Sequence, residues 1–203
     1  MKNLFIAATV LVLASMVQAV PYWPEHPDGV VYHYVGESGA AKDIVYSQDG
    51  INQYREHIYD NPDCTGGESF VIEDGTVGLT GHGYYCEGSI DPVYWDYNPP
   101  LTIVREGMQD GDIWVWEGWC FNGPAIIMVQ VSDETITTPL GTMDVLHVQL
   151  QTITGDGFPF GGHLYLDQDL GPVKTGNLTL VDVDGVVGVA NRSWSGVKSL
   201  FHD

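Results

Sequence analysis

Short segments of alternating apolar and polar residues fill most of the chain, which is the pattern of β-strands with one buried face. The longest such segment covers residues 142–152, where Leu146, Val148 and Leu150 share one face while His147 and Gln149 fall on the other. We expect the first of these faces to be buried. After residue 19, no stretch keeps the spacing of an amphipathic helix over three turns without an interrupting Gly or Pro.

The dipeptide Asp-Gly separates many of these segments, and it favours hairpin turns because type I′ turns need a positive φ at both central residues. Its six copies begin at Asp28, Asp49, Asp74, Asp110, Asp156 and Asp184. The remaining expected strands cover residues 30–35, 43–47, 51–59, 69–73, 77–86, 93–97, 101–105, 112–121, 125–131, 163–167, 177–183 and 186–194. The sequence therefore predicts an all-β protein, built as a single antiparallel barrel, half-barrel or sandwich of about a dozen short strands.

Two proline-rich stretches interrupt the alternation. Residues 20–28 hold Pro21, Pro24 and Pro27, and we expect them to form an extended, loosely attached lead. Residues 98–100 read Asn-Pro-Pro, which we interpret as a connection between two strands rather than as a linker between domains. We therefore expect one all-β domain over residues 20–203.

The first 19 residues have the features of a secretory signal peptide. Lys2 is followed by an apolar run of 11 residues at 4–14, and small residues stand at Val17 and Ala19, three and one positions before the expected cleavage. The run is too short to cross a bilayer as a helix, and no later run reaches 18 apolar residues. We expect a secreted or periplasmic protein with no transmembrane segment in the mature chain.

The chain is strongly acidic, with 27 Asp and Glu against 7 Lys and Arg and a formal net charge of −20. Loss of residues 1–19 removes one Lys and no acid, so the mature charge is −20 − 1 = −21. Such a field repels phosphate backbones and excludes nucleic acid as the expected partner. Because 44% of residues are hydrophobic and only 17% are charged, the acidity does not indicate disorder.

Three cysteines fit an oxidising compartment, and their spacing matches no zinc-finger or redox motif. Cys64 lies in a turn-rich stretch and Cys86 ends a Gly- and Tyr-rich strand, so we predict a disulfide between them. The odd count leaves other pairings open, including Cys86 with Cys120. Cys120 lies between Trp119 and Phe121 and is interpreted as a small buried hydrophobic residue.

The order of motifs between residues 110 and 174 resembles a known group. Asp110-Gly111-Asp112-Ile113-Trp114 opens a strand, and Thr138-Pro139-Leu140-Gly141-Thr142-Met143 leads into the long alternating strand. Leu164-Tyr165-Leu166-Asp167-Gln168-Asp169-Leu170-Gly171-Pro172-Val173-Lys174 closes the series. The pattern is similar to that of uncharacterised secreted β-rich proteins related to the half-barrels of LolA-type lipoprotein carriers, and it covers about a third of the chain.

This resemblance implies an antiparallel sheet wrapped around an apolar interior, and non-catalytic handling of a hydrophobic or protein ligand. It carries over no catalytic residues. The chain differs from those carriers in its acidity and in having no evident helical lid.

Aromatic residues form the main candidate ligand site. Trp114 and Trp116 share one face of a strand, and Tyr94, Trp95 and Phe121 lie nearby in sequence. Two interpretations compete: a platform on which a sugar ring or apolar ligand stacks, and an ordinary aromatic core. An inward orientation of the two tryptophans favours a ligand-binding barrel, and an exposed row favours a sugar-binding surface.

Other polar residues offer weaker candidates for chemistry. Asp182 and Asp184 resemble part of a calcium loop but lack its third acid and its Glu, so a solvated hairpin turn is the competing interpretation. His147 and His163 are expected on adjacent strands, where they could meet across one face. Glu106 and Glu117 could serve as a glycosidase pair, although their spacing is permissive.

These observations lead to three hypotheses from different classes. The first is an exported, non-enzymatic β-protein that binds a hydrophobic small molecule or a protein partner in an apolar concavity and needs no cofactor. The second is a carbohydrate-binding module or a glycoside-acting enzyme. The third is an acidic surface or matrix protein with a structural role.

Overall fold

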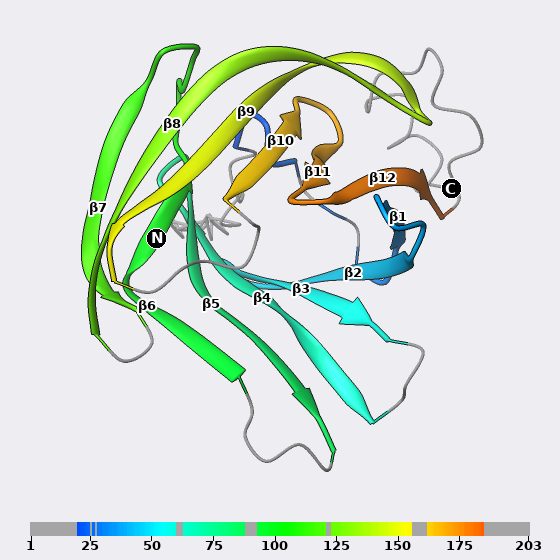
Figure 1. The fold of residues 1–203 in the computed structure, drawn as a ribbon, viewed down its shortest axis with the longest axis horizontal. Helices are drawn as coiled ribbons and strands as arrows, with labels where there is room; N and C mark the ends of the chain where they lie inside the picture. The colour runs from blue at the N-terminus through cyan, green and yellow to red at the C-terminus, as the bar shows by residue number, and fades with distance from the viewer. Residues whose placement is uncertain are drawn as a thin grey trace, which may run out of the picture.

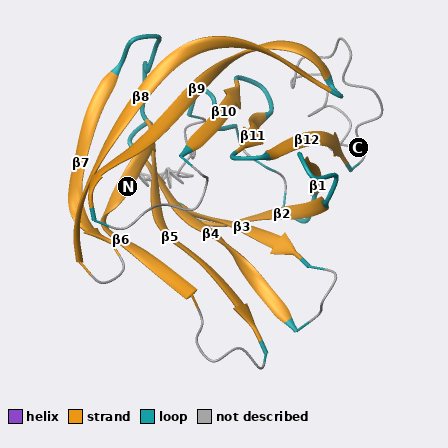
Figure 2. Cartoon of the chain, in the orientation of Figure 1, coloured by secondary structure: helices purple, strands orange, loops and turns teal. Residues whose placement is uncertain are grey.

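The computed structural model describes residues 20–24, 26, 28–59, 63–87, 93–120, 123–155 and 162–184. In this part of the chain twelve strands close into one antiparallel barrel (Figure 1). Every strand pairs with its neighbours in sequence, and β1 pairs with β12 to close the ring. Figure 2 shows strands and loops without a helix in the same residues. The prediction of a single all-β barrel with about a dozen strands is confirmed.

The strand bounds, in chain order, are β1 Val31–Gly36, β2 Ala41–Asp49, β3 Asn52–Ile58, β4 Cys64–Glu73, β5 Thr76–Cys86, β6 Val93–Val104, β7 Ile113–Cys120, β8 Gly123–Thr138, β9 Gly141–Thr154, β10 His163–Asp167, β11 Gly171–Thr175 and β12 Leu178–Val183. The expected signal peptide, the Asp156-Gly157 turn and the strand at 186–194 lie outside the described residues. No helix in the described part of the chain has the length and apolar character needed to cross a membrane.

The faces of the long strands and one Asp-Gly turn follow the sequence pattern, whereas Asp28, Asp49 and Asp110 do not have the positive φ of a type I′ turn. Asp74 and Gly75 join β4 to β5 with φ values of 49° and 72°, as a type I′ turn requires. A side chain at Gly75 would also approach Glu106, since an added Cβ would lie 2.9 Å from the Glu106 Cβ. On β9, Leu146, Val148 and Leu150 are buried, as predicted from the alternation.

The number and the division of the strands depart from the prediction at two places, and β4 and β8 are longer than expected. β6 is one strand from Val93 to Val104 and runs through the cis Asn98–Pro99 bond, where a connection between two strands was expected. Proline is tolerated there because the β5–β6 register skips from Leu101 to Asp96, so Pro99 and Pro100 need not donate to that ladder. β11 was not predicted, because its first residues, Gly171 and Pro172, are typical of a turn.

The expectation of a loosely attached lead is wrong for the described part of residues 20–28. Val20, Trp23 and His26 are buried, and the Trp23 side chain is only 1% exposed. The Trp23 indole donates a hydrogen bond to Gln53 Oε1 at 2.7 Å, and the His26 ring stacks on Tyr46 with centroids 3.8 Å apart. Residues 20–24 and 26, called the N-terminal segment below, therefore form part of the core.

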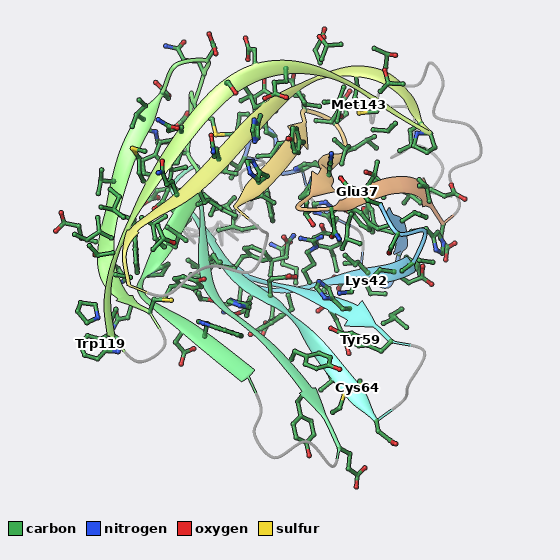
Figure 3. The ribbon with its side chains drawn as sticks, in the orientation of Figure 1. Glu37, Lys42, Tyr59, Cys64, Trp119 and Met143 are labelled. Carbon is green, nitrogen blue, oxygen red and sulfur yellow. A yellow bond between two sulfur atoms is a disulfide. The ribbon has the colours of Figure 1, made fainter. Side chains whose placement is uncertain are left out.

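The buried residues form two clusters. The larger one is mostly aliphatic and takes residues from β4 to β10 together with Val20 and Trp23. The smaller one is rich in tyrosine and contains Tyr32, Tyr34 and Tyr46 from β1 and β2 with Leu180 and Val183 from β12. The tip of the β8–β9 hairpin packs against it through Ile136, Leu140 and Met143, and Figure 3 labels Met143 near this tip.

Candidate functional site

The inner face of β3 is polar, which is unusual for a barrel strand. Gln53 and Arg55 are buried, with exposed fractions of 0% and 1%, while Tyr54 and Ile58 on the alternate face are 46% and 47% exposed. Hydropathy alone would place Tyr54 and Ile58 inside. β3 therefore brings a charged side chain into the barrel and leaves apolar side chains outside.

Arg55 lies beside a buried carboxylate from the next strand. Arg55 and Glu68 are cross-strand partners in the β3–β4 register, and Arg55 Nε lies 3.9 Å from Glu68 Oε2. His57, two residues along β3, places Nε2 at 2.9 Å from the same oxygen. Glu68 is thus shared by two basic side chains, and these residues with Lys42 of β2 are called the interior polar cluster.

Burial and charge act against each other on the ionisable groups of this cluster. Burial alone would raise the pKa of Glu68, but Arg55 and the contact with His57 outweigh it and hold that pKa below its usual range. Burial lowers the pKa of His57 despite the neighbouring Glu68. The cluster therefore contains an ionised carboxylate and a histidine whose neutral form is favoured.

Tyrosines from β1 and β2 border the cluster. The Arg55 guanidinium lies 5.6 Å from the centroid of the Tyr34 ring, and the Tyr34 hydroxyl donates to the Pro172 carbonyl at 2.6 Å. Burial, followed by the nearby charge of Arg55, lowers the pKa of His26 to about 3, so the ring that stacks on Tyr46 is neutral. Aromatic rings from β1 and β2 thus line one side of the cluster.

Lys42 marks the end of the cluster that is nearest the solvent. Its side chain is partly buried, and its ammonium lies 5.2 Å from the centroid of the Tyr59 ring. Lys42 is also the cross-strand partner of Tyr34. Figure 3 labels Lys42, Tyr59 and Cys64 in sequence along this side of the barrel.

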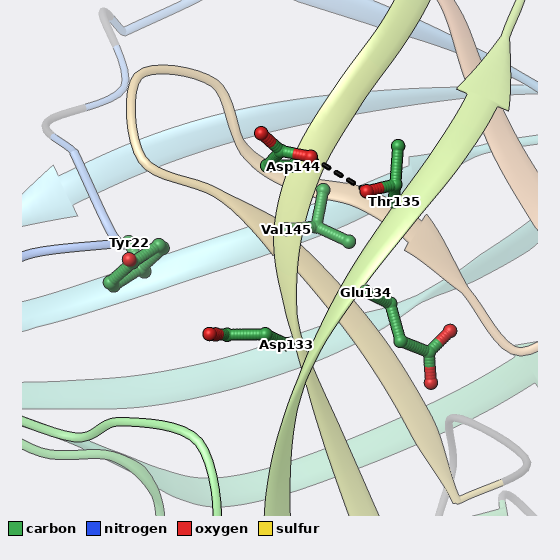
Figure 4. A pocket seen from close by; sticks show the side chains of 6 residues that line it. All are labelled: Tyr22, Asp133, Glu134, Thr135, Asp144 and Val145. Carbon is green, nitrogen blue, oxygen red and sulfur yellow. Dashed lines mark hydrogen bonds between the residues drawn. The ribbon is translucent and has the colours of Figure 1, made fainter.

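A separate pocket of about 420 Å³ lies between the N-terminal segment and the β8–β9 hairpin (Figure 4). Its lining residues are Tyr22, Asp133, Glu134, Thr135, Asp144 and Val145. The Thr135 hydroxyl donates to Asp144 at 2.7 Å. Figure 4 shows the Asp133 carboxylate on the side facing Tyr22 and the Glu134 carboxylate on the other side of β8. The pocket is polar and acidic rather than apolar.

The predicted tryptophan pair faces the interior and bridges a gap in the barrel wall. β6 and β7 pair only at Tyr97–Cys120 and Asn98–Trp119 among the described residues. Beyond that point the indoles of Trp114 and Trp116 donate to the carbonyls of Thr102 and Pro99, both at 3.0 Å. Trp116 is buried and Trp114 packs against the larger core cluster, so the two form no exposed row.

Of the other predicted aromatic residues, Trp95 is the one whose side chain the structure describes. Trp95 stacks on His82 with ring centroids 4.3 Å apart, and burial lowers the pKa of His82 to about 4. Tyr94 pairs through its backbone with Gly83, and its side chain lies outside the described part of the structure. Phe121 also lies outside the described residues. Trp119 is 54% exposed and projects at the outer edge of the barrel (Figure 3).

The predicted disulfide between Cys64 and Cys86 is confirmed, and the two residues are direct partners in the β4–β5 register. Cys120 is buried and takes no part in this disulfide. The proposed calcium ligands Asp182 and Asp184 have separate roles: Asp182 accepts from the Val183 amide at 2.9 Å, and Asp184 contacts His33. In the described part of the chain, no three His, Cys, Asp or Glu side chains converge in a way that could hold a metal ion.

His147 and His163 do meet across the outer face of β9 and β10. His147 Nε2 lies 2.8 Å from His163 Nδ1, and His147 Nδ1 lies 2.6 Å from Glu134 Oε1. Since both nitrogens of His147 are engaged within the chain, this histidine orients its neighbours and presents no free lone pair. The Tyr165 ring covers it at a centroid distance of 4.3 Å.

Sequence reasoning missed the interior polar cluster. The signal was present, because Gln53, Arg55 and His57 alternate with Tyr54 and Ile58 on an expected strand. Alternation defines two faces but does not say which one is inside, and the hydrophobic face was the natural choice.

Comparison of the chain with protein-family models, with curated proteins and with solved structures finds no match.

Proposed function

We propose that the protein is a non-enzymatic binding protein that acts after export and takes up a hydrophobic ligand in the interior of its barrel. The proposal assigns no catalytic residue. It places the ligand where the aliphatic core cluster meets the tyrosine-rich side, close to Trp23 and Phe70, whose ring centroids are 5.0 Å apart.

The observation that carries this proposal is the Arg55–Glu68 pair buried inside the barrel. A core with a purely structural role gains little from such a pair, because apolar residues of similar volume are often as stabilising. Buried ionisable groups with shifted pKa values cluster at functional sites. The inward orientation of Trp114 and Trp116 also supports a binding interior over an exposed sugar-binding platform.

Two features support action outside the cytoplasm. The pattern of residues 1–19 is that of a signal peptide, and the Cys64–Cys86 disulfide is of the kind that persists in oxidising compartments. The periplasm and the extracellular space both fit these features.

The test is a titration of the disulfide-bonded protein with the neutral apolar dye N-phenyl-1-naphthylamine, and in parallel with a panel of soluble oligosaccharides followed by tryptophan fluorescence. We expect saturable binding of the dye, displaced by a long-chain alcohol, and no response to the sugars. A saturable response to a sugar alone would overturn the proposal in favour of a carbohydrate-binding module.

Trp119→Ala is the matched control, since Trp119 is the exposed tryptophan of β7. Binding in the interior predicts that this variant binds the dye as the wild type does. Loss of dye binding in Trp119→Ala would show that the dye reports an outer apolar surface, and the interior site would have to be abandoned.

A further inference from the structure

The interior polar cluster contains more positive charge than negative charge among the described residues. Arg55 and Lys42 are the cationic side chains, although burial lowers the pKa of Lys42. Glu68 carries one negative charge, and burial favours the neutral form of His57. Glu68 is already engaged by Arg55 and His57, and Lys42 forms no ion pair with a described residue. This local excess stands out in a chain whose formal net charge is −20.

Geometry brings the two cations to one place. Tyr34 is the direct cross-strand neighbour of Lys42, and the same ring lies 5.6 Å from the Arg55 guanidinium. Lys42 contacts Tyr59, and His57 lies 6.3 Å from that ring between centroids. Lys42, Arg55 and His57 therefore lie together on the inner face of the sheet, where β2 begins and β3 ends.

Buried hydrogen-bond donors near the cluster lack acceptors. Gln53 is fully buried two residues before Arg55 on the same face of β3, and its Nε2 makes no hydrogen bond to a described residue. The Tyr32 hydroxyl, on the strand that pairs with β2, is also buried and also makes no hydrogen bond to a described residue. Buried polar groups are normally satisfied by protein, water or ligand, and these two can both donate. An acceptor group on a ligand could satisfy either of them.

The polar cluster adjoins apolar side chains of the core. Gln53 is the register partner of Phe70, and Phe70 contacts Trp23 in the larger core cluster. A molecule with an anionic head at Lys42 and Arg55 would thus have aliphatic and aromatic side chains along its tail.

We propose that the interior polar cluster recognises the carboxylate head of an amphipathic ligand, with Lys42 and Arg55 as its cationic partners. This inference rests on the proposed function and deepens it, because it names the ligand class as a long-chain carboxylic acid. Burial makes the charge-assisted contacts strong, whereas the acidic exterior offers such an anion no comparable site.

The experiment compares hexadecanoic acid with 1-hexadecanol, which share one chain length, as competitors of N-phenyl-1-naphthylamine on the disulfide-bonded protein. We expect the acid to bind about tenfold more tightly than the alcohol at neutral pH, as one charge-assisted contact would provide. Lys42→Met should remove this preference while leaving the affinity for the alcohol unchanged. Thermal melting followed by circular dichroism checks that the variant folds.

Lys174→Met is the matched control, because it removes the same charge from a lysine that also lies over a tyrosine, 5.3 Å from the Tyr165 centroid. This variant should keep the preference for the acid. Equal binding of acid and alcohol by the wild type would overturn the headgroup inference and leave the proposed function standing. Loss of the preference in both variants would assign it to net charge, which also overturns the inference. Binding of neither competitor would reject the proposed function itself.

Discussion

His33 connects the strands at the closure of the barrel. It lies on the outer face of β1, with Nδ1 at 2.7 Å from Asp43 of β2 and Nε2 at 2.9 Å from Asp184, the residue after β12. The contacts with Asp184 and then Asp43 raise the pKa of His33 above its usual value. The two carboxylates therefore favour the charged imidazolium, which links β12 to β1 and β2.

This pKa shift predicts how stability depends on pH. Since protonation of His33 is favoured in the folded state, its contribution is fully present below the unfolded pKa of about 6.5 and is lost as pH rises through the higher folded value. We expect His33→Gln to lower Tm at pH 5.5 and to change it little at pH 9, in thermal melts of both proteins.

Asp49→Asn is the control for this measurement, because Asp49 is an exposed carboxylate at the end of β2, remote in register from His33. A deficit of His33→Gln that is as large at pH 9 as at pH 5.5 would mean that His33 acts through packing rather than through its charge.

At the scale of single residues, the sequence predicted the Cys64–Cys86 pair and the buried face of β9, since both depend on local context. It could not predict the burial of Arg55, because the cost of burying a charge is offset by Glu68, which is 13 positions away and becomes a neighbour only through the β3–β4 register. His147 and His163 could be matched because their strands are adjacent and the alternation sets their faces.

At the scale of elements, the seam between β6 and β7 is closed by side chains where the backbone ladder ends. Pro99 and Pro100 have no N–H to donate, and the indoles of Trp114 and Trp116 reach the carbonyls of this stretch from β7. Gly118 allows the close approach, because an added Cβ would collide with the Trp116 ring and lie 2.7 Å from the Asn98 carbonyl oxygen. The tryptophans thus stabilise the barrel wall.

Trp116→Phe tests this role, since it removes the indole N–H and leaves the Pro99 carbonyl without its donor. We expect a loss of about 2 kcal/mol in the free energy of unfolding, measured by urea denaturation, from the lost hydrogen bond and the reduced side-chain volume. Trp119→Phe, at the exposed end of the same strand, should change it by less than about 0.5 kcal/mol. Equal effects of the two changes would contradict the role assigned to the seam.

Element boundaries were harder to predict than element types. The Asp-Gly turns identified hairpins because their φ preference is local, and Asp74-Gly75 behaves accordingly. The prediction divided β6 in two and missed β11, and both strands contain Pro. Pro fits a strand only where the neighbouring strand does not need a backbone N–H from that position, and the pairing of the whole sheet decides this. The burial of Trp23 likewise depends on a barrel that forms elsewhere in the chain.

At the scale of the whole molecule, positive charge is scarce and is placed against aromatic rings. All four Lys and Arg residues within the described ranges lie over a ring: Lys42 on Tyr59, Arg55 on Tyr34, Arg105 on Trp114 and Lys174 on Tyr165. They compensate little of the excess of acidic residues, so self-repulsion opposes the compact state.

Screening should therefore stabilise the protein. We expect Tm to rise by several degrees when NaCl is increased from about 0.02 M to about 0.5 M. The added salt shortens the Debye length and so weakens the repulsion between surface carboxylates. CaCl2 at matched ionic strength should give an equal rise. A further saturable rise with calcium that Asp182→Asn abolishes would instead identify a calcium site at the end of β12.

The buried N-terminal segment sets an order of events for biogenesis. Val20 and Trp23 are the earliest described residues to be synthesised, yet they are enclosed by strands that close into a ring only once Val183 of β12 has paired with Tyr32 of β1. Closure across so long a sequence separation is slow compared with the formation of local hairpins. These early residues are thus among the last to be buried. Proteases or chaperones that meet the unfolded chain have access to them until the barrel is closed.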